Sequence, residues 1–183
     1  METSVKITTL LGQPAQPLAL AGNPQMEEGC VATAYDAGVN YFFFYNLSFD
    51  TLITELKPQL AKNRESIVVA TGSESRNPRA LRTYLSQVRH RLEVDVIDVF
   101  YAEYVAPGED METLFGPGGV FDELHRWKAQ GLIRYVGATA HNRLLAVKLI
   151  ESGRIEVLMH RYNMAHRGAE ERCLLYTSPS PRD

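Results

Sequence analysis

The sequence predicts an α/β fold, an incomplete barrel of the TIM (β/α)8 type with about six parallel strands and their helices. Short apolar runs alternate with stretches whose apolar residues recur at helical spacing, which is typical of βαβ units and a parallel sheet. An eight-stranded barrel usually needs about 250 residues, whereas this chain has 183. The elements therefore fit a barrel that has been cut short. A complete, doubly wound open sheet is the alternative architecture.

The expected strands are short apolar runs bounded by turn residues. The run at 17–21 closes at Gly22, while 66–70 (SIVVA) and 96–101 (VIDVFY) are the near-continuous apolar runs that parallel sheets bury on both faces. The strands are expected at residues 17–21, 40–44, 66–70, 96–101, 133–137 and 155–159.

The expected helices lie between these strands. The first ends at Gly38 and the one that contains Trp127 ends at Gly131, since glycine is the residue that most often follows a helix C-terminus. The helices are expected at residues 27–37, 49–60, 78–92 and 118–130, with a further helix between the last two strands. Arginines gather on the polar face of the third helix, which indicates a solvated outer surface: Arg79, Arg82, Arg89 and Arg91.

The composition indicates an ordinary globular protein. Apolar residues make up 45% of the chain and charged residues 22%, and the formal net charge is −3. With so small an acidic charge and no long basic block, we expect neither nucleic acid nor an anionic membrane as a partner. The N-terminal segment is too short and interrupted for a signal peptide or a membrane span, so a cytoplasmic location is expected. The oligomeric state is not predicted.

The C-terminal end of the chain differs from the rest. Residues 173–183, CLLYTSPSPRD, resemble the in-frame translation of a transposase library adapter, and we expect them to be a non-native tail after a partial barrel domain at 1–172. A natural disordered tail rich in serine and proline is the alternative. Cys30 and Cys173 are isolated cysteines without CxxC spacing, so no metal site is expected.

Five segments end at the places where such folds keep their functional residues, the loops after the C-terminal ends of the strands. They are GVNYFFFYN (38–46), VVATGSES (68–75), DVIDVFYAEYV (95–105), GLIRYVGAT (131–139) and MHRYN (159–163). Together they resemble a divergent branch of the aldo-keto reductase family, C-terminally truncated. The resemblance implies a barrel that reduces aldehydes or ketones with NADPH, using a tyrosine acid supported by lysine, aspartate and histidine.

The resemblance places other residue types at the four catalytic positions. Phe43 stands for the aspartate, Ser48 for the tyrosine, Gly72 for the lysine and Glu103 for the histidine. Phenylalanine and glycine carry no ionisable group, so ordinary carbonyl reduction is in question. Tyr45 could substitute as the acid, although an aromatic cluster at a strand end is more often packing.

Glu103 is the candidate catalytic residue. If it is buried at the apolar end of a strand, its carboxyl group will have a raised pKa and can act as an acid or a hydrogen-bond donor. The alternative is a partly exposed glutamate paired with an arginine such as Arg134.

Two residues after the fifth strand are candidates for binding the nicotinamide amide of NADPH. Thr139 keeps a hydroxyl group where the family has serine, and Asn142 could supply the amide that Ala140 lacks. Asn142 could equally begin the following helix, since asparagine is a good N-cap.

The loop after the sixth strand is basic. His160, Arg161, His166 and Arg167 suit an anion, while pairing with Glu170 and Glu171 is the structural alternative.

Two functions remain open on these grounds. The first is an NADP-dependent oxidoreductase of the aldo-keto reductase type, with its site rebuilt around Glu103 and Tyr104 to act on a small molecule. The second is a non-catalytic barrel that binds a nucleotide or a metabolite.

Overall fold

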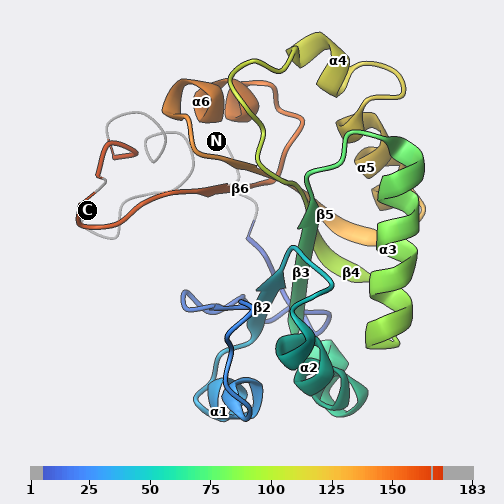
Figure 1. The fold of residues 1–183 in the computed structure, drawn as a ribbon, viewed down its shortest axis with the longest axis vertical. Helices are drawn as coiled ribbons and strands as arrows, with labels where there is room; N and C mark the ends of the chain where they lie inside the picture. The colour runs from blue at the N-terminus through green and yellow to red at the C-terminus, as the bar shows by residue number, and fades with distance from the viewer. Residues whose placement is uncertain (1–5, 166, 171–183) are drawn as a thin grey trace.

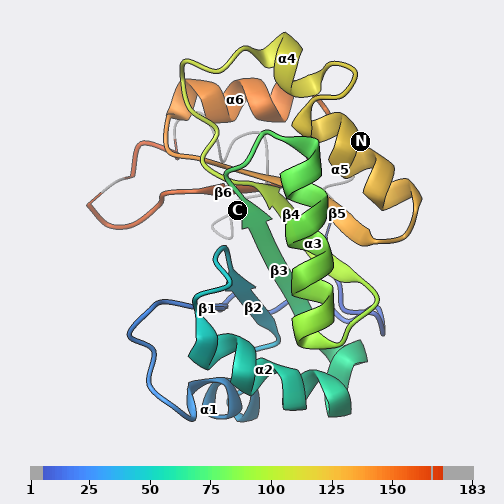
Figure 2. The same ribbon diagram turned by 45° about the vertical axis from the view of Figure 1, so that its right-hand side comes forward.

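The computed structural model describes residues 6–165 and 167–170, and its six parallel strands form one sheet in the order β1-β2-β3-β4-β5-β6. Each strand pairs only with its neighbours in sequence, whereas a doubly wound sheet reverses its strand order at a switch point. Figures 1 and 2 show the sheet curling from β2 to β6 with the helices on its outer side. The fold is an incomplete barrel, and the doubly wound alternative is wrong. The expected tail at 173–183 lies outside the described residues.

The strands and the long helices overlap the ranges that the sequence predicts, with ends that differ by up to three residues. The strands are β1 (Leu20–Ala21), β2 (Tyr41–Phe44), β3 (Val68–Ser73), β4 (Ile97–Ala102), β5 (Ile133–Ala140) and β6 (Val157–His160). The helices are α1 (Cys30–Asp36), α2 (Asp50–Asn63), α3 (Pro78–Leu92), α4 (Met111–Phe115), α5 (Val120–Ala129) and α6 (Arg143–Glu151). α4 is not predicted, because its five residues are too few to show a helical period. β5 runs on to Ala140, where it pairs with His160 of β6.

The helix α3 shows how local sequence and packing agree. Asn77 caps its N-terminus by accepting hydrogen bonds from two backbone N–H groups, and Pro78 occupies the first turn, where no N–H partner is needed. Its apolar stripe is fully or almost fully buried against the sheet: Leu81, Leu85, Val88 and Leu92. Of the arginines expected in solvent, Arg79 and Arg82 are exposed, whereas Arg91 donates to the Leu47 carbonyl oxygen (2.7 Å) and to Asp50 (2.6 Å).

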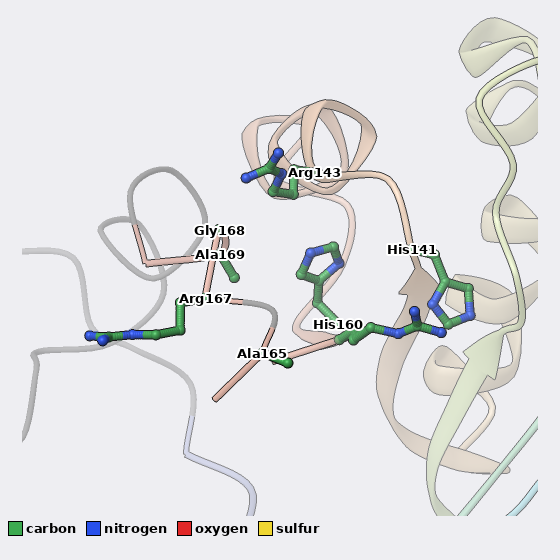
Figure 3. A pocket seen from close by; sticks show the side chains of 8 residues that line it. His141, Arg143, His160, Ala165, Arg167, Gly168 and Ala169 are labelled. Atoms are coloured by element: carbon green, nitrogen blue, oxygen red, sulfur yellow. The ribbon is translucent and has the colours of Figure 1, made fainter. Parts of the chain in front are cut away.

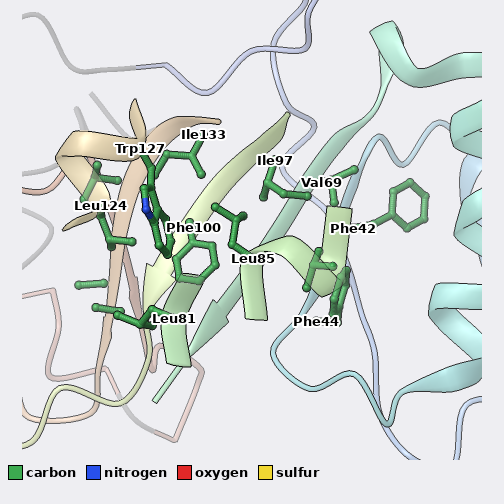
Figure 4. Close-up of a cluster of buried hydrophobic side chains, with 14 of the residues drawn as sticks. Phe42, Phe44, Val69, Leu81, Leu85, Ile97, Phe100, Leu124, Trp127 and Ile133 are labelled. Carbon is green, nitrogen blue, oxygen red and sulfur yellow. The ribbon is translucent and has the colours of Figure 1, made fainter. Parts of the chain in front are cut away.

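Two apolar layers sit on opposite faces of the curled sheet, because side chains alternate along each strand. The outer layer lies between sheet and helices, where Phe100 of β4 meets Trp127 of α5 edge to face at 5.2 Å, as Figure 4 shows. The inner layer fills the concave side of the curled sheet, called the curl below. Its side chains come from β2, β3 and β4: Tyr41, Phe43, Val68, Ala70, Val99 and Tyr101. The inner layer supports the strand ends that carry the site.

The N-terminal ends of the strands are held by the fully buried Asp98. Its carboxylate accepts hydrogen bonds from Arg134 (2.7 Å) and from the Val69 N–H (2.8 Å), and it forms an ion pair with Arg64 (3.0 Å). Arg134 also donates to the Thr8 carbonyl oxygen, which fastens the N-terminal segment to the sheet. The alternative that Arg134 pairs with Glu103 is therefore wrong, since Arg134 is engaged at the opposite end of the strands.

Candidate functional site

The C-terminal ends of β3, β4 and β5 bring Gly72, Glu103 and Thr139 together. β3 and β4 pair Gly72 with Tyr101, and β4 and β5 pair Ala102 with Ala138. Glu103 follows Tyr101 by two residues, so its side chain emerges on the same inner face of the sheet. The predicted catalytic residue thus reaches the mouth of the curl, next to a residue predicted to bind cofactor.

Glu103 is buried, with 8% of its surface exposed. Its Oε2 accepts a hydrogen bond from the Thr139 hydroxyl group at 2.8 Å, whereas Oε1 is buried without a hydrogen-bond partner in the described part of the chain. A buried carboxylate oxygen without a partner is costly, because water would otherwise solvate it. This oxygen is therefore poised to hold a proton.

Gly72 makes the room that Glu103 occupies. A Cβ atom added at Gly72 would lie 2.6 Å from Glu103 Oε1 and 2.7 Å from its Cγ, closer than real contacts allow. The side chain at Glu103 therefore excludes any side chain at residue 72 in the observed arrangement. Gly72 and Glu103 are thus linked by packing, and both stand at positions where the resemblance expects other catalytic side chains.

Burial raises the pKa of Glu103 from 4.5 to about 7. The loss of hydration is the largest cause, and the nearby charge of Glu74 adds to it, while the Thr139 hydrogen bond and Arg76 oppose it. The carboxyl group can therefore exchange a proton near neutral pH. The sequence predicts a raised pKa for a buried Glu103, and the pKa is raised in the structure.

Two tyrosines lie deeper on the inner face. The hydroxyl groups of Tyr41 and Tyr101 are hydrogen-bonded at 2.8 Å, and the Tyr101 ring packs over Gly137, where an added Cβ would lie 2.4 Å from the ring. Burial raises the pKa of Tyr41 to about 12 and that of Tyr101 well above its usual value. Both phenols stay protonated near neutrality and are weaker acids than Glu103.

The other catalytic positions carry residues without acid-base chemistry. Phe43 is buried edge to face against Tyr101 at 5.7 Å, and Ser48 is exposed in the loop before α2. Tyr45 is 47% exposed and packs edge to face on Phe49 at 5.1 Å. These ring contacts are compatible with a packing role, and a role of Tyr45 as the acid remains a prediction.

Thr139 holds the loop after β4 as well as Glu103. Its hydroxyl oxygen accepts from the Tyr104 N–H at 2.6 Å, and its carbonyl oxygen accepts from the Val105 N–H at 2.9 Å. These bonds fix Tyr104 in a left-handed conformation (φ 49°), with its exposed ring 5.3 Å from the ring of His141. Thr139 is therefore a positioning residue for Glu103, and its contact with a cofactor remains a prediction.

Asn142 begins the helix α6. Its Oδ1 atom accepts from the Leu145 N–H at 3.0 Å, which confirms the capping alternative. The side chain is exposed, so its Nδ2 group can still donate outward. The cofactor role of Asn142 is compatible with the cap and remains a prediction.

Arg76 also belongs to the site, although no pattern in the sequence predicts it. Its guanidinium group donates to the Glu103 carbonyl oxygen at 2.9 Å and pairs with Glu109 at 2.6 Å. The loop after β3 is thereby tied to the loop after β4. No group of histidine, cysteine and acidic residues in the described ranges could hold a metal ion, and no helix there is long and apolar enough to cross a membrane.

Comparison with known proteins agrees with this fold. The sequence model of the aldo/keto reductase family matches residues 21–178. The fold is similar to a protein named as an aldo-keto reductase from Pseudomonas aeruginosa, with a TM-score of 0.73 and 19% identity over 93% of this chain and 73% of that one. No match was found among curated proteins.

Two further solved structures show the same fold. The glycerol dehydrogenase from Gluconobacter oxydans gives a TM-score of 0.73 at 17% identity, over 96% of this chain and 60% of that one. The Bombyx mori aldo-keto reductase in complex with NADP gives 0.66 at 16% identity, over 89% and 60%. At such identities the likeness shows the fold alone, and this chain spans only part of each relative.

Proposed function

This chain belongs to the aldo/keto reductase family, and we propose that it is an NADP-dependent oxidoreductase for a small carbonyl compound, with Glu103 as the residue that exchanges the proton. The observation that carries the proposal is the buried Glu103 carboxyl group, with its pKa of about 7 and a partnerless Oε1 at the mouth of the curl. A general acid works best when its pKa lies near the working pH.

The proposed reaction needs one hydride and one proton. NADPH, when bound, supplies the hydride to the carbonyl carbon. The protonated Glu103 gives its proton to the carbonyl oxygen, which becomes the alcohol, and the carboxylate left behind regains a proton from solvent. In the reverse direction the same carboxylate accepts the proton of the alcohol.

The residues around Glu103 support this role. Thr139 fixes the carboxyl group through Oε2 at 2.8 Å, which leaves the buried Oε1 as the oxygen that holds the proton. Gly72 leaves the room that this oxygen occupies. The exposed Nδ2 group of Asn142 suits the carbonyl oxygen of a nicotinamide amide, which would place the cofactor beside Glu103.

The second candidate function is a non-catalytic barrel that binds a nucleotide or a metabolite. The observation that favours it is the inner face itself, where Phe43 and Gly72 supply no polar group and both buried tyrosines are paired with each other. Such a site would bind without turnover.

The test combines NADPH binding with turnover. NADPH binding is measured by calorimetry, and NADPH oxidation is followed by absorbance with a panel of aldehydes and ketones. The proposal predicts binding, weakened in Asn142→Ala, and turnover that Glu103→Gln abolishes. Binding with no turnover for any carbonyl compound would favour the non-catalytic barrel, and no binding of NADPH would exclude both the cofactor and the reductase.

A further inference from the structure

A cavity lies between the start of α6 and the loop that follows β6. Its volume is about 350 Å³, and its basic lining residues are His141, Arg143, His160, Arg161 and Arg167. Figure 3 shows the His160 ring near its centre, with Arg143 above, His141 at one side and Arg167 directed outward. Volumes of roughly 300–1,000 Å³ are usual for small-molecule sites.

The lining is strongly positive. Three arginines and two histidines line the cavity, and no acidic side chain is among the lining residues. Glu170 partly balances the set by pairing with Arg167 at 3.1 Å. No acidic residue in the described part of the chain forms an ion pair with Arg161. Such a concentration of positive charge on converging segments favours an anionic ligand.

Two contacts show that the cavity is a built arrangement. A Cβ atom added at Gly168 would lie 1.8 Å from Arg143 Nη1, so the guanidinium group rests directly against the backbone of the loop after β6. The His160 Nδ1–H donates to the carbonyl oxygen of Ala140, the last residue of β5. This bond fixes the imidazole ring and turns its other nitrogen away from the strand.

We propose that this cavity binds the phosphate group of a small ligand. Phosphate is the anion that arginine guanidinium groups recognise with paired hydrogen bonds, and three such groups with two imidazoles match its several oxygens. The site is independent of the reductase activity and would serve a non-catalytic barrel equally. The phosphate could belong to a nucleotide or to a phosphorylated metabolite.

The position of the cavity links it to Glu103 through β5. Thr139 bonds Glu103, the next residue Ala140 bonds His160, and the following residue His141 lines the cavity. The cavity therefore adjoins the end of the same strand that positions Glu103.

The test is calorimetric titration of the protein with inorganic phosphate and with pyrophosphate, at constant ionic strength. Arg143→Gln and Arg161→Gln should each weaken binding about tenfold or more, which is about 1.4 kcal/mol per factor of ten. Gly168→Ala should also weaken it, because the added methyl group displaces Arg143 without changing the charge. Arg79→Gln, which removes an exposed arginine on α3, is the matched control and should leave binding unchanged.

Repeating the titration with saturating NADPH separates the two sources of phosphate. Competition between pyrophosphate and NADPH would support the cavity as a nucleotide phosphate site. Phosphate binding that persists beside NADPH would support a site for a phosphorylated metabolite. The proposal would be overturned by a lack of saturable binding, or by equal weakening in Arg79→Gln and Arg143→Gln.

Discussion

Replacing Glu103 by glutamine should change how the stability of the protein depends on pH. The folded protein holds the Glu103 proton up to a pKa of about 7, whereas the unfolded chain releases it at about 4.5. Between these values the folded state binds more protons than the unfolded state, so the free energy of unfolding falls as the pH rises. The full loss of stability is reached above pH 7, and no stability is lost in this way below pH 4.5.

The size of the effect follows from the shift. Each pKa unit corresponds to about 1.4 kcal/mol, so the change from 4.5 to about 7 costs the folded protein about 3 kcal/mol above neutrality. Glu103→Gln keeps the acceptor for the Thr139 hydroxyl group but carries no charge at any pH. The variant should therefore exceed the original protein in stability by about 3 kcal/mol at pH 8 and by little at pH 4.

Urea unfolding across this pH range, followed by far-UV circular dichroism, measures both proteins. Glu151→Gln, which removes an exposed carboxylate at the end of α6, is the control and should not reproduce the gain. Equal pH dependence in the original protein and in Glu103→Gln would show that the Glu103 carboxyl group is not desolvated, and the reasoning would fail.

Three other substitutions test the structure around the site. Gly72→Ala should destabilise the protein by about 1–3 kcal/mol in urea unfolding, because its Cβ would lie 2.7 Å from the Tyr101 carbonyl oxygen as well as against Glu103; unchanged stability would refute this contact. Asp98→Ala should cost about 3 kcal/mol or more, because it removes the buried carboxylate that both Arg64 and Arg134 face, and a loss under 1 kcal/mol would count against this role of Asp98. Asn142→Ala should lower the melting temperature through the loss of about 1 kcal/mol of N-capping, with Asn142→Asp as the variant that restores it.

Much of the fold is readable from the sequence, because apolar periodicity marks each main element. The six strands and the long helices follow from it, and the strand order follows because consecutive βα units add in sequence around a barrel. The short helix α4 escapes prediction, since Asp110 caps it but its five residues span little more than one turn. Its position depends on packing against α5 more than on its own pattern.

The site is only partly readable. Glu103 and Thr139 can be singled out from their strand ends, but their hydrogen bond depends on the register of β4 and β5, which sequence spacing does not show. The pairing of Arg134 with Glu103 is wrong for the same reason, since the register brings Arg134 to Asp98. The room that Gly72 leaves for Glu103 likewise appears only when β3 and β4 are side by side.

The most direct test of Glu103 as the proton-exchanging residue is the pH dependence of NADPH oxidation with a carbonyl substrate, in the original protein and in Glu103→Gln. The carboxyl group must be protonated for reduction, so the rate should fall as the pH rises through about 7. Glu103→Gln should lose this activity while it still binds NADPH. A Glu103→Gln variant that reduces the substrate at the original rate, with the original pH profile, would contradict the proposed role.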